Sequence, residues 1–256
     1  MLSDIKQRHF GFIEILSSTL NLFANHFLLI STFSFLIVLG SSILGNLENL
    51  IYIVLVCPAI AIFFAYIINA KIERKTIAYG KIWQLYRQKI FRIIGLYLLI
   101  LMYLIFLAVI LFSLGFIAYL LALLLKIDLS SLPFDVYIFS SIGILLVGLI
   151  AEYFFQHSFY AVILKGKYGD DALKYSAELV KSRQIENLII IPIIFGGLFG
   201  TNYLLSMAFG FIYQYTNIYL GLWLYAFAFQ IVLGFFVAAN IIWFLNIDYS
   251  YNRIHK

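Results

Sequence analysis

The side chains best suited to chemistry in this 256-residue chain lie inside apolar runs. Glu152 falls near the middle of one such run, where an ionised carboxylate costs at least about 2.5 kcal/mol and is by default a candidate functional group. Gln156, four residues further on, shares the helix face of Glu152. His157 lies about 140° away around the helix and is therefore not a simple neighbour of the carboxylate.

Polar residues in two later apolar runs are candidate partners for Glu152. They are Asn202 and Ser206 in one run, and Gln230 and Asn240 in the next. A protonated Glu152 that hydrogen-bonds across helices and a proton or substrate site are both compatible with this pattern. The substitution Glu152→Gln would separate the two roles, since only the second loses transport or proton dependence while the fold is kept.

The sequence offers little material for a metal, cofactor or soluble catalytic site. His157 has no partner at metal-ligand spacing, because the other histidines lie in terminal or interfacial segments. Cys57, the single cysteine, excludes an intrachain disulfide. Neither a nucleophile motif nor a phosphate-binding loop is present. We therefore expect no metal, no cofactor, no enzymatic activity and no binding of nucleic acid.

The composition makes lipid the main solvent of the chain. Hydrophobic residues make up 64% of the sequence and charged residues 11%, with a mean hydropathy of +1.02, whereas about a quarter of the residues in soluble domains are charged. Apolar runs long enough to cross a hydrocarbon core roughly 30 Å thick recur along the chain. We predict an all-α membrane protein with six transmembrane helices, at about 27–44, 50–70, 93–125, 136–164, 188–212 and 219–245.

Lysine and arginine predict the orientation of these helices. Of the 17 such residues, all except Lys126 lie before the first span, in the second and fourth loops, or after the last span. The positive-inside rule assigns that face to the cytoplasm. We therefore expect a protein of the bacterial cytoplasmic (inner) membrane with both termini in the cytoplasm.

A short amphipathic segment precedes each odd-numbered span. The three segments share apolar residues at steps of four and three, which lie on one face of a helix. The stripes are Leu16, Leu20 and Phe23; Tyr79, Trp83 and Tyr86; and Leu173, Ala177 and Val180. Such helices lie in the membrane interface with the apolar face in the acyl region. We predict one six-helix transmembrane domain (1–256), built from three repeats of interfacial helix plus transmembrane hairpin at about 8–70, 71–165 and 166–248.

Basic residues in and around these segments are candidate contacts for lipid headgroups. They are Arg74, Lys75, Lys81, Arg87, Lys89, Arg92, Lys174, Lys181 and Arg183. Cationic side chains at this depth attract anionic lipids. The alternative is that the segments only orient the spans that follow them. The basic residues then need no lipid-binding role, because the positive-inside rule alone places cations in cytoplasmic loops. The expected partners are membrane lipids, including anionic ones, or a membrane protein.

The third amphipathic segment carries a family resemblance. Residues 171–183, with the sequence DALKYSAELVKSR, resemble the signature segment of the glycerophosphoryl diester phosphodiesterase membrane-domain family and related six-span bacterial membrane proteins. The matching residues are Ala172, Leu173, Ser176, Leu179, Val180 and Lys181. Relatives often end the last span with an aromatic-aspartate-arginine stretch, whereas here Asp248 is followed by Tyr249 and Ser250. The resemblance implies a membrane module linked to lipids or the envelope, without the phosphodiesterase barrel.

These features predict a non-enzymatic integral membrane protein that interacts with lipids or a membrane partner. The alternative is a small secondary transporter or channel that uses the intramembrane carboxylate of Glu152. That alternative requires polar residues from several spans to line one cavity. A GxxxG pair, Gly196 and Gly200, also permits a close helix contact, which we expect to form within the protomer.

Overall fold

The computed structural model describes residues 2–44, 56–124, 155–215 and 218–254, and the regular structure in these ranges is entirely helical. The elements in chain order are η1 (Leu2–Lys6), α1 (Phe12–Leu44), α3 (Cys57–Ile72), α4 (Tyr79–Leu124), α6 (Ser158–Tyr160), the π-helical turn η5 (Ala161–Lys165), α7 (Gly169–Ser182), α8 (Gln184–Tyr215) and α9 (Ile218–Ile254). The all-helical prediction is confirmed for this part of the chain.

Four helices contain a stretch long and apolar enough to cross a membrane. The stretches are Phe12–Leu39, Gly80–Ile117, Gln184–Gly210 and Leu220–Ile254. They overlap the first, third, fifth and sixth predicted spans. The second predicted span is represented by α3, which has 16 described residues. Most of the fourth, including Glu152, lies outside the described residues. Six spans therefore remain a prediction, whereas four candidate spans are present.

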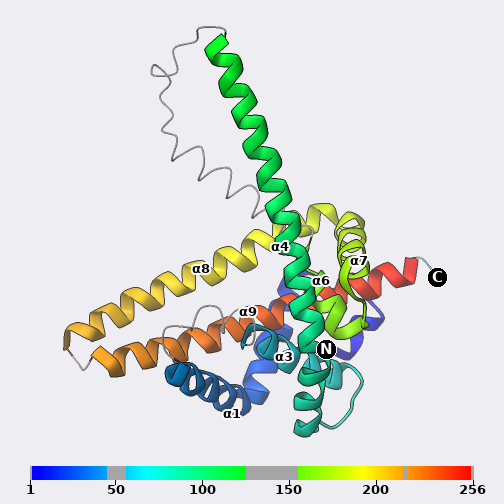
Figure 1. Cartoon of the computed structure of the whole chain (residues 1–256). Coiled ribbons are helices and arrows are strands. Elements are labelled where there is room, and N and C mark those ends of the chain that lie inside the picture. The colour runs from blue at the N-terminus through cyan, green and yellow to red at the C-terminus, as the bar shows by residue number, and fades with distance from the viewer. Residues whose placement is uncertain (1, 45–55, 125–154, 216–217, 255–256) are drawn as a thin grey trace.

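Helix α9 lies at the centre of the packing. Figure 1 shows α8 and α9 as an antiparallel hairpin with α1 beside α9, while α4 projects away from this group. The C-terminal half of α9 is almost fully enclosed, with Trp243 and Phe244 at 1% and 0% exposure. Helix α3 is apolar around its whole circumference and buried along nearly all its length, as expected for a helix enclosed by others.

Aromatic rings form the contact between α1, α3 and α9. Phe33 and Phe63 stack with ring centroids 4.1 Å apart, and Phe23 stacks on Phe64 at 5.4 Å. The ring of Phe64 occupies the space that a side chain at Gly234 would need, since a Cβ there would lie 2.8 Å from Phe64 Cε2. The absence of a side chain at Gly234 therefore lets α3 approach α9 closely.

The three amphipathic segments join their spans in different ways. His26, at the predicted start of the first span, has non-helical angles (φ −126°, ψ 21°) and kinks α1. Arg183 (φ −142°, ψ 48°) separates α7 from α8. The second segment continues into its span without a break as part of α4.

The apolar faces of these segments also differ in what covers them. Leu20 of α1 and Trp83 of α4 are 55% and 63% exposed, as expected for side chains directed to lipid. On α7, by contrast, Leu173 and Val180 are at most 4% exposed, because η5, α6 and the end of α9 pack over them. The face of α7 that the sequence directs to the acyl region is therefore covered by protein.

The predicted GxxxG contact lies one residue away from its expected position. A Cβ on Gly196 or Gly200 would meet no atom of the described residues within 4 Å, whereas a Cβ on Gly197 would lie 2.8 Å from Phe236 Cε1. The rotation of α8 therefore turns Gly197 toward α9 and leaves the GxxxG pair facing outward.

Candidate functional site

The predicted polar residues Gln156 and His157 lie directly before α6 and pack inside the protein. Gln156 and His157 are 9% and 0% exposed. The His157 Nε2 atom lies 3.4 Å from both Gln156 Nε2 and Asn187 Oδ1, so this nitrogen accepts from the first or donates to the second, according to its tautomer. The partner that sequence reasoning proposed, Glu152, lies outside the described residues.

Asn187 connects this pair to three helices. Its Oδ1 atom accepts a hydrogen bond from Trp243 Nε1 at 3.0 Å, and its Nδ2 atom donates to the carbonyl of Arg183 at 3.0 Å. The backbone N–H of His157 donates to Ser176 Oγ at 3.2 Å. These contacts tie α7, α8 and α9 together around His157, so the ring has a structural role in this part of the fold.

The other predicted polar residues do not converge on one site. Asn202 accepts a hydrogen bond of 2.6 Å from the Tyr225 hydroxyl, between α8 and α9. Gln230 and Asn240 are buried on α9, but at 1.5 Å per residue they lie about 15 Å apart along its axis. Within the described ranges, no three histidine, cysteine, aspartate or glutamate side chains gather where they could hold a metal ion.

The most connected polar group is one that sequence reasoning missed. We call it the Asp248 cluster, and it consists of Asp248, Lys165, Tyr175 and Asn252. The Asp248 side chain is 0% exposed, and its Oδ2 atom lies 2.5 Å from Lys165 Nζ. The Tyr175 hydroxyl donates to Asp248 Oδ1, and Asn252 Nδ2 lies 3.2 Å from the same atom. One carboxylate thus joins η5, α7 and the end of α9.

Tyr175 keeps its proton within the Asp248 cluster. Burial, and to a lesser extent the neighbouring carboxylate of Asp248, raise the pKa of Tyr175 above its ordinary value. The phenol therefore remains neutral and donates a hydrogen bond to Asp248. The arrangement has the features of a structural clamp, because each of the four side chains contacts at least one other member of the cluster.

A second set of contacts fixes the N-terminal segment to the same region. Asn246 accepts from the backbone N–H of Phe10 at 2.8 Å and donates to its carbonyl at 2.9 Å. Glu186 pairs with His9 at 3.0 Å and with Arg183 at 2.9 Å. The start of the chain is thereby held against α8 and α9.

The nine predicted headgroup candidates fall into two groups. Several are engaged within the protein: Lys75 pairs with Glu73, Lys174 with Asp170, and Arg183 with Glu186, while Lys89 and Arg92 contact the segment before α7. The exposed side chains of Arg74, Lys81, Arg87 and Lys181 form no ion pair with the described residues. Five of the nine candidates are therefore positioned by contacts within the described protein, and the other four are not.

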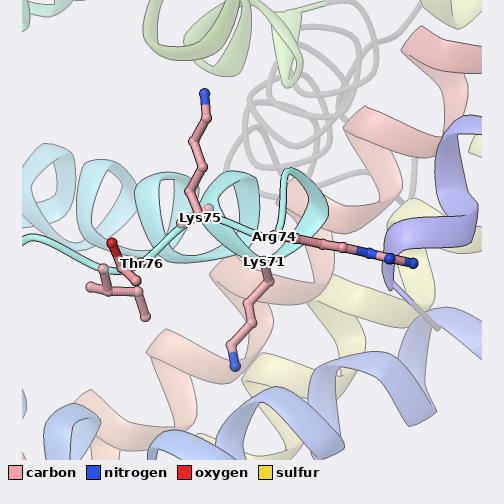
Figure 2. Close-up of a pocket in the computed structure, with 6 residues that line it drawn as sticks. Lys71, Arg74, Lys75 and Thr76 are labelled. Carbon is pink, nitrogen blue, oxygen red and sulfur yellow. The ribbon is translucent and has the colours of Figure 1, made fainter.

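An open hollow of about 520 Å³ lies at the end of α3, lined in part by Lys71, Arg74 and Lys75. Figure 2 shows that these three basic side chains point in different directions from the helix end. Arg74 also closes the helix in a left-handed conformation, with φ +54°. Because the cations diverge, the hollow does not offer a convergent anion site.

No protein-family model, curated protein or solved structure matches this chain.

Proposed function

We propose that this chain is a non-enzymatic integral protein of a bacterial inner membrane, which interacts with lipids or a membrane partner through the outer surfaces of its helices. The observation that carries the proposal is that polar side chains lie in the protein core while large apolar side chains lie on its outer surface. Polar side chains of the described core are used in packing, whereas Met102, Phe106 and Leu204 on the outside are 68%, 65% and 66% exposed. Apolar surface of this extent requires lipid or protein to cover it.

We further propose six spans with both termini in the cytoplasm, supported by the one-sided distribution of lysine and arginine. Single cysteines in a Cys57→Ser background test this topology. A membrane-impermeant maleimide should label Asn46→Cys, Asp128→Cys and Asn217→Cys in intact cells. The variants Lys81→Cys and Lys181→Cys should react only after permeabilisation. Labelling of Lys81→Cys from outside would contradict the topology.

The family resemblance of residues 171–183 supports a membrane module linked to lipids. On α7 most matching residues lie on the buried face: Ala172, Leu173, Ser176, Leu179 and Val180. Lys181 alone is exposed. The segment therefore fits a role in docking α7 onto the rest of the fold, which is consistent with a shared architecture and needs no shared reaction.

A transporter would need a polar cavity between spans. The two best-defined hollows of the described residues are the open one at the end of α3 and a small apolar one of about 30 Å³ between α1, α8 and α9. Neither is lined by Gln156, His157, Asn202 or Gln230. Proteoliposome flux that depends on Glu152 and is lost in Glu152→Gln would replace our proposal with transport.

Native mass spectrometry of protein released directly from its own membrane tests the lipid and partner interactions together. A reproducible bound phospholipid supports lipid interaction, and a co-released protein supports an accessory role. A bare monomer, seen under conditions that retain lipids on a control membrane protein, would contradict both.

A further inference from the structure

Two basic side chains of α4 converge on the turn that precedes α7. The Arg92 guanidinium lies over the ring of Tyr168, 4.1 Å from its centroid, and donates to its hydroxyl. Lys89 Nζ lies 3.3 Å from the carbonyl oxygen of Val162. Gly166 (φ +68°) lies beside both Lys89 and Tyr168. A Cβ at this position would lie 3.8 Å from Lys89 Nζ and 3.9 Å from the Tyr168 hydroxyl.

None of the described acidic residues forms an ion pair with either of these two cations. Among the described residues, neither Lys89 nor Arg92 forms an ion pair, in contrast to Lys165 with Asp248. Asp170, the first acid after the turn, is paired with Lys174 at 2.6 Å. An ammonium group and a guanidinium fork, with a hydroxyl between them, are the donors that phosphate oxygens prefer.

One side of the α4 surface beyond these cations is apolar and open, whereas Tyr103 on the adjoining side donates a hydrogen bond to Asp170 at 3.4 Å. Gly95, Met102 and Phe106 lie within about 80° of Arg92 around the helix, at 100° per residue. A Cβ on Gly95 would meet no described atom within 4 Å, and Met102 and Phe106 are 68% and 65% exposed. An uncovered strip of α4 at Gly95 therefore connects the charged site with the exposed apolar side chains of Met102 and Phe106.

We propose that Lys89, Arg92 and Tyr168 bind the phosphate of an anionic glycerophospholipid whose acyl chain lies along α4 at Gly95, Met102 and Phe106. This inference rests on the proposed lipid interaction and adds its site and the charge class of the lipid. Two cations without an ion-pair partner among the described residues favour a headgroup with net negative charge over a zwitterionic one, whose own ammonium group would be repelled. The apolar continuation favours a membrane lipid over a soluble phosphate compound.

The test compares two double variants in the full-length protein. Lys89→Gln/Arg92→Gln removes one lysine and one arginine from the site, and Lys81→Gln/Arg87→Gln removes the same two residue types from exposed positions of the same helix. Binding of phosphatidylglycerol and of phosphatidylcholine to each purified protein is titrated by native mass spectrometry. We expect wild type to prefer phosphatidylglycerol, and the site variant to lose about tenfold in affinity, as for a lost charge-assisted hydrogen bond. The control variant should stay close to wild type.

Other outcomes separate the site from the general function. Equal losses in both variants would overturn the site and leave diffuse attraction of anionic lipid by the basic face. Equal binding of the two lipids by wild type would overturn the proposed preference for an anionic headgroup. Binding of neither lipid would also overturn the lipid interaction itself. Displacement of the lipid by millimolar inorganic phosphate would overturn the membrane-lipid assignment.

A milder substitution keeps the inference testable if the site variant folds poorly. Tyr168→Phe retains the ring beneath Arg92 and removes only the hydroxyl that the guanidinium contacts. We expect a smaller loss of phosphatidylglycerol affinity, by a few fold, with unchanged binding of phosphatidylcholine. Unchanged affinity for both lipids would remove Tyr168 from the site.

Discussion

The Asp248 carboxylate at the end of α9 is fully buried, and its Oδ2 atom lies 2.5 Å from Lys165 Nζ, whose side chain is 30% exposed. Tyr175 and Asn252 engage the other carboxylate oxygen. A buried charge is stable only when it is paired and its remaining lone pairs are satisfied. The pair therefore holds the end of the last helix to η5, which ends at Lys165.

Removal of the cation from this pair should be costly. We expect Lys165→Met to lower the free energy of unfolding by about 3 kcal/mol, because it leaves the Asp248 carboxylate buried without a counter-ion. Unfolding of the purified protein in detergent, followed by circular dichroism, gives the measurement. The double variant Lys165→Met/Asp248→Asn should recover part of the loss, since no unpaired charge remains.

The ion pair of Lys174 and Asp170 provides the control for this experiment. Both side chains are largely exposed, although their charged atoms lie at a similar distance of 2.6 Å. Exposed pairs contribute little, because water solvates each partner when the other is lost. A loss in Lys174→Met as large as that in Lys165→Met would show that burial of Asp248 is not the source of the effect.

Alkaline pH should expose the contribution of Tyr175. Its pKa is raised above the ordinary value of 10.0, first by burial and then by Asp248. The folded protein therefore retains this proton at a pH where the unfolded chain has released it, so the stabilisation is complete below about pH 10 and is lost as the pH rises further. The stability difference between wild type and Tyr175→Phe should begin to shrink at about pH 10 and should continue to shrink as the pH is raised further. A constant difference would contradict the assigned shift.

Asn187 should be required for the junction of α7, α8 and α9. Asn187→Leu removes the acceptor of the buried Trp243 N–H and a partner of His157. An unsatisfied buried donor costs roughly 1–3 kcal/mol, and we expect a loss of about 2 kcal/mol. Trp243 fluorescence, with the other tryptophans replaced by phenylalanine, should shift to shorter wavelength. Asn202→Leu, at a half-buried position, is the matched control and should cost less.

The helical class and four of the spans could be predicted from the sequence because they depend on local properties. Apolar runs and the spacing of charges are visible without tertiary contacts. The same is true of the amphipathic face of α7, where the predicted stripe includes Leu173 and Val180. What covers that face is not a local property, since either lipid or apolar residues of distant elements can bury it.

The Asp248 cluster could not be predicted for the same reason. Lys165 and Tyr175 come from the consecutive elements η5 and α7, whereas Asp248 lies 73 residues beyond Tyr175, and only the fold brings it to them. One indication was present in the sequence, because Asp248 and Asn252 lie one turn apart, on the same face of the helix that ends the chain's last apolar run. From the sequence we instead selected Glu152 as the candidate functional group, because it lies within a longer apolar run. Glu152 lies outside the described residues.

Glycine substitutions should separate internal helix packing from contacts between molecules. At Gly234 an added Cβ would lie 2.8 Å from the ring of Phe64, which is 1% exposed and is stacked on Phe23. Because this ring has no free space to enter, Gly234→Ala should destabilise the protein by about 1–3 kcal/mol. Gly197→Ala should cost less, since Phe236 is only half-buried and can shift.

The outward-facing glycines, Gly196 and Gly200, supply the control, because a Cβ on either meets no described atom within 4 Å. Their alanine variants should leave thermal unfolding unchanged or raise the midpoint slightly, since alanine favours the helix by up to about 1 kcal/mol. Thermal unfolding and size-exclusion chromatography with light scattering are measured on all four variants. If Gly196→Ala dissociates an oligomer while Gly197→Ala does not, the GxxxG face joins two copies of the chain. If neither changes the mass, that face is covered by lipid.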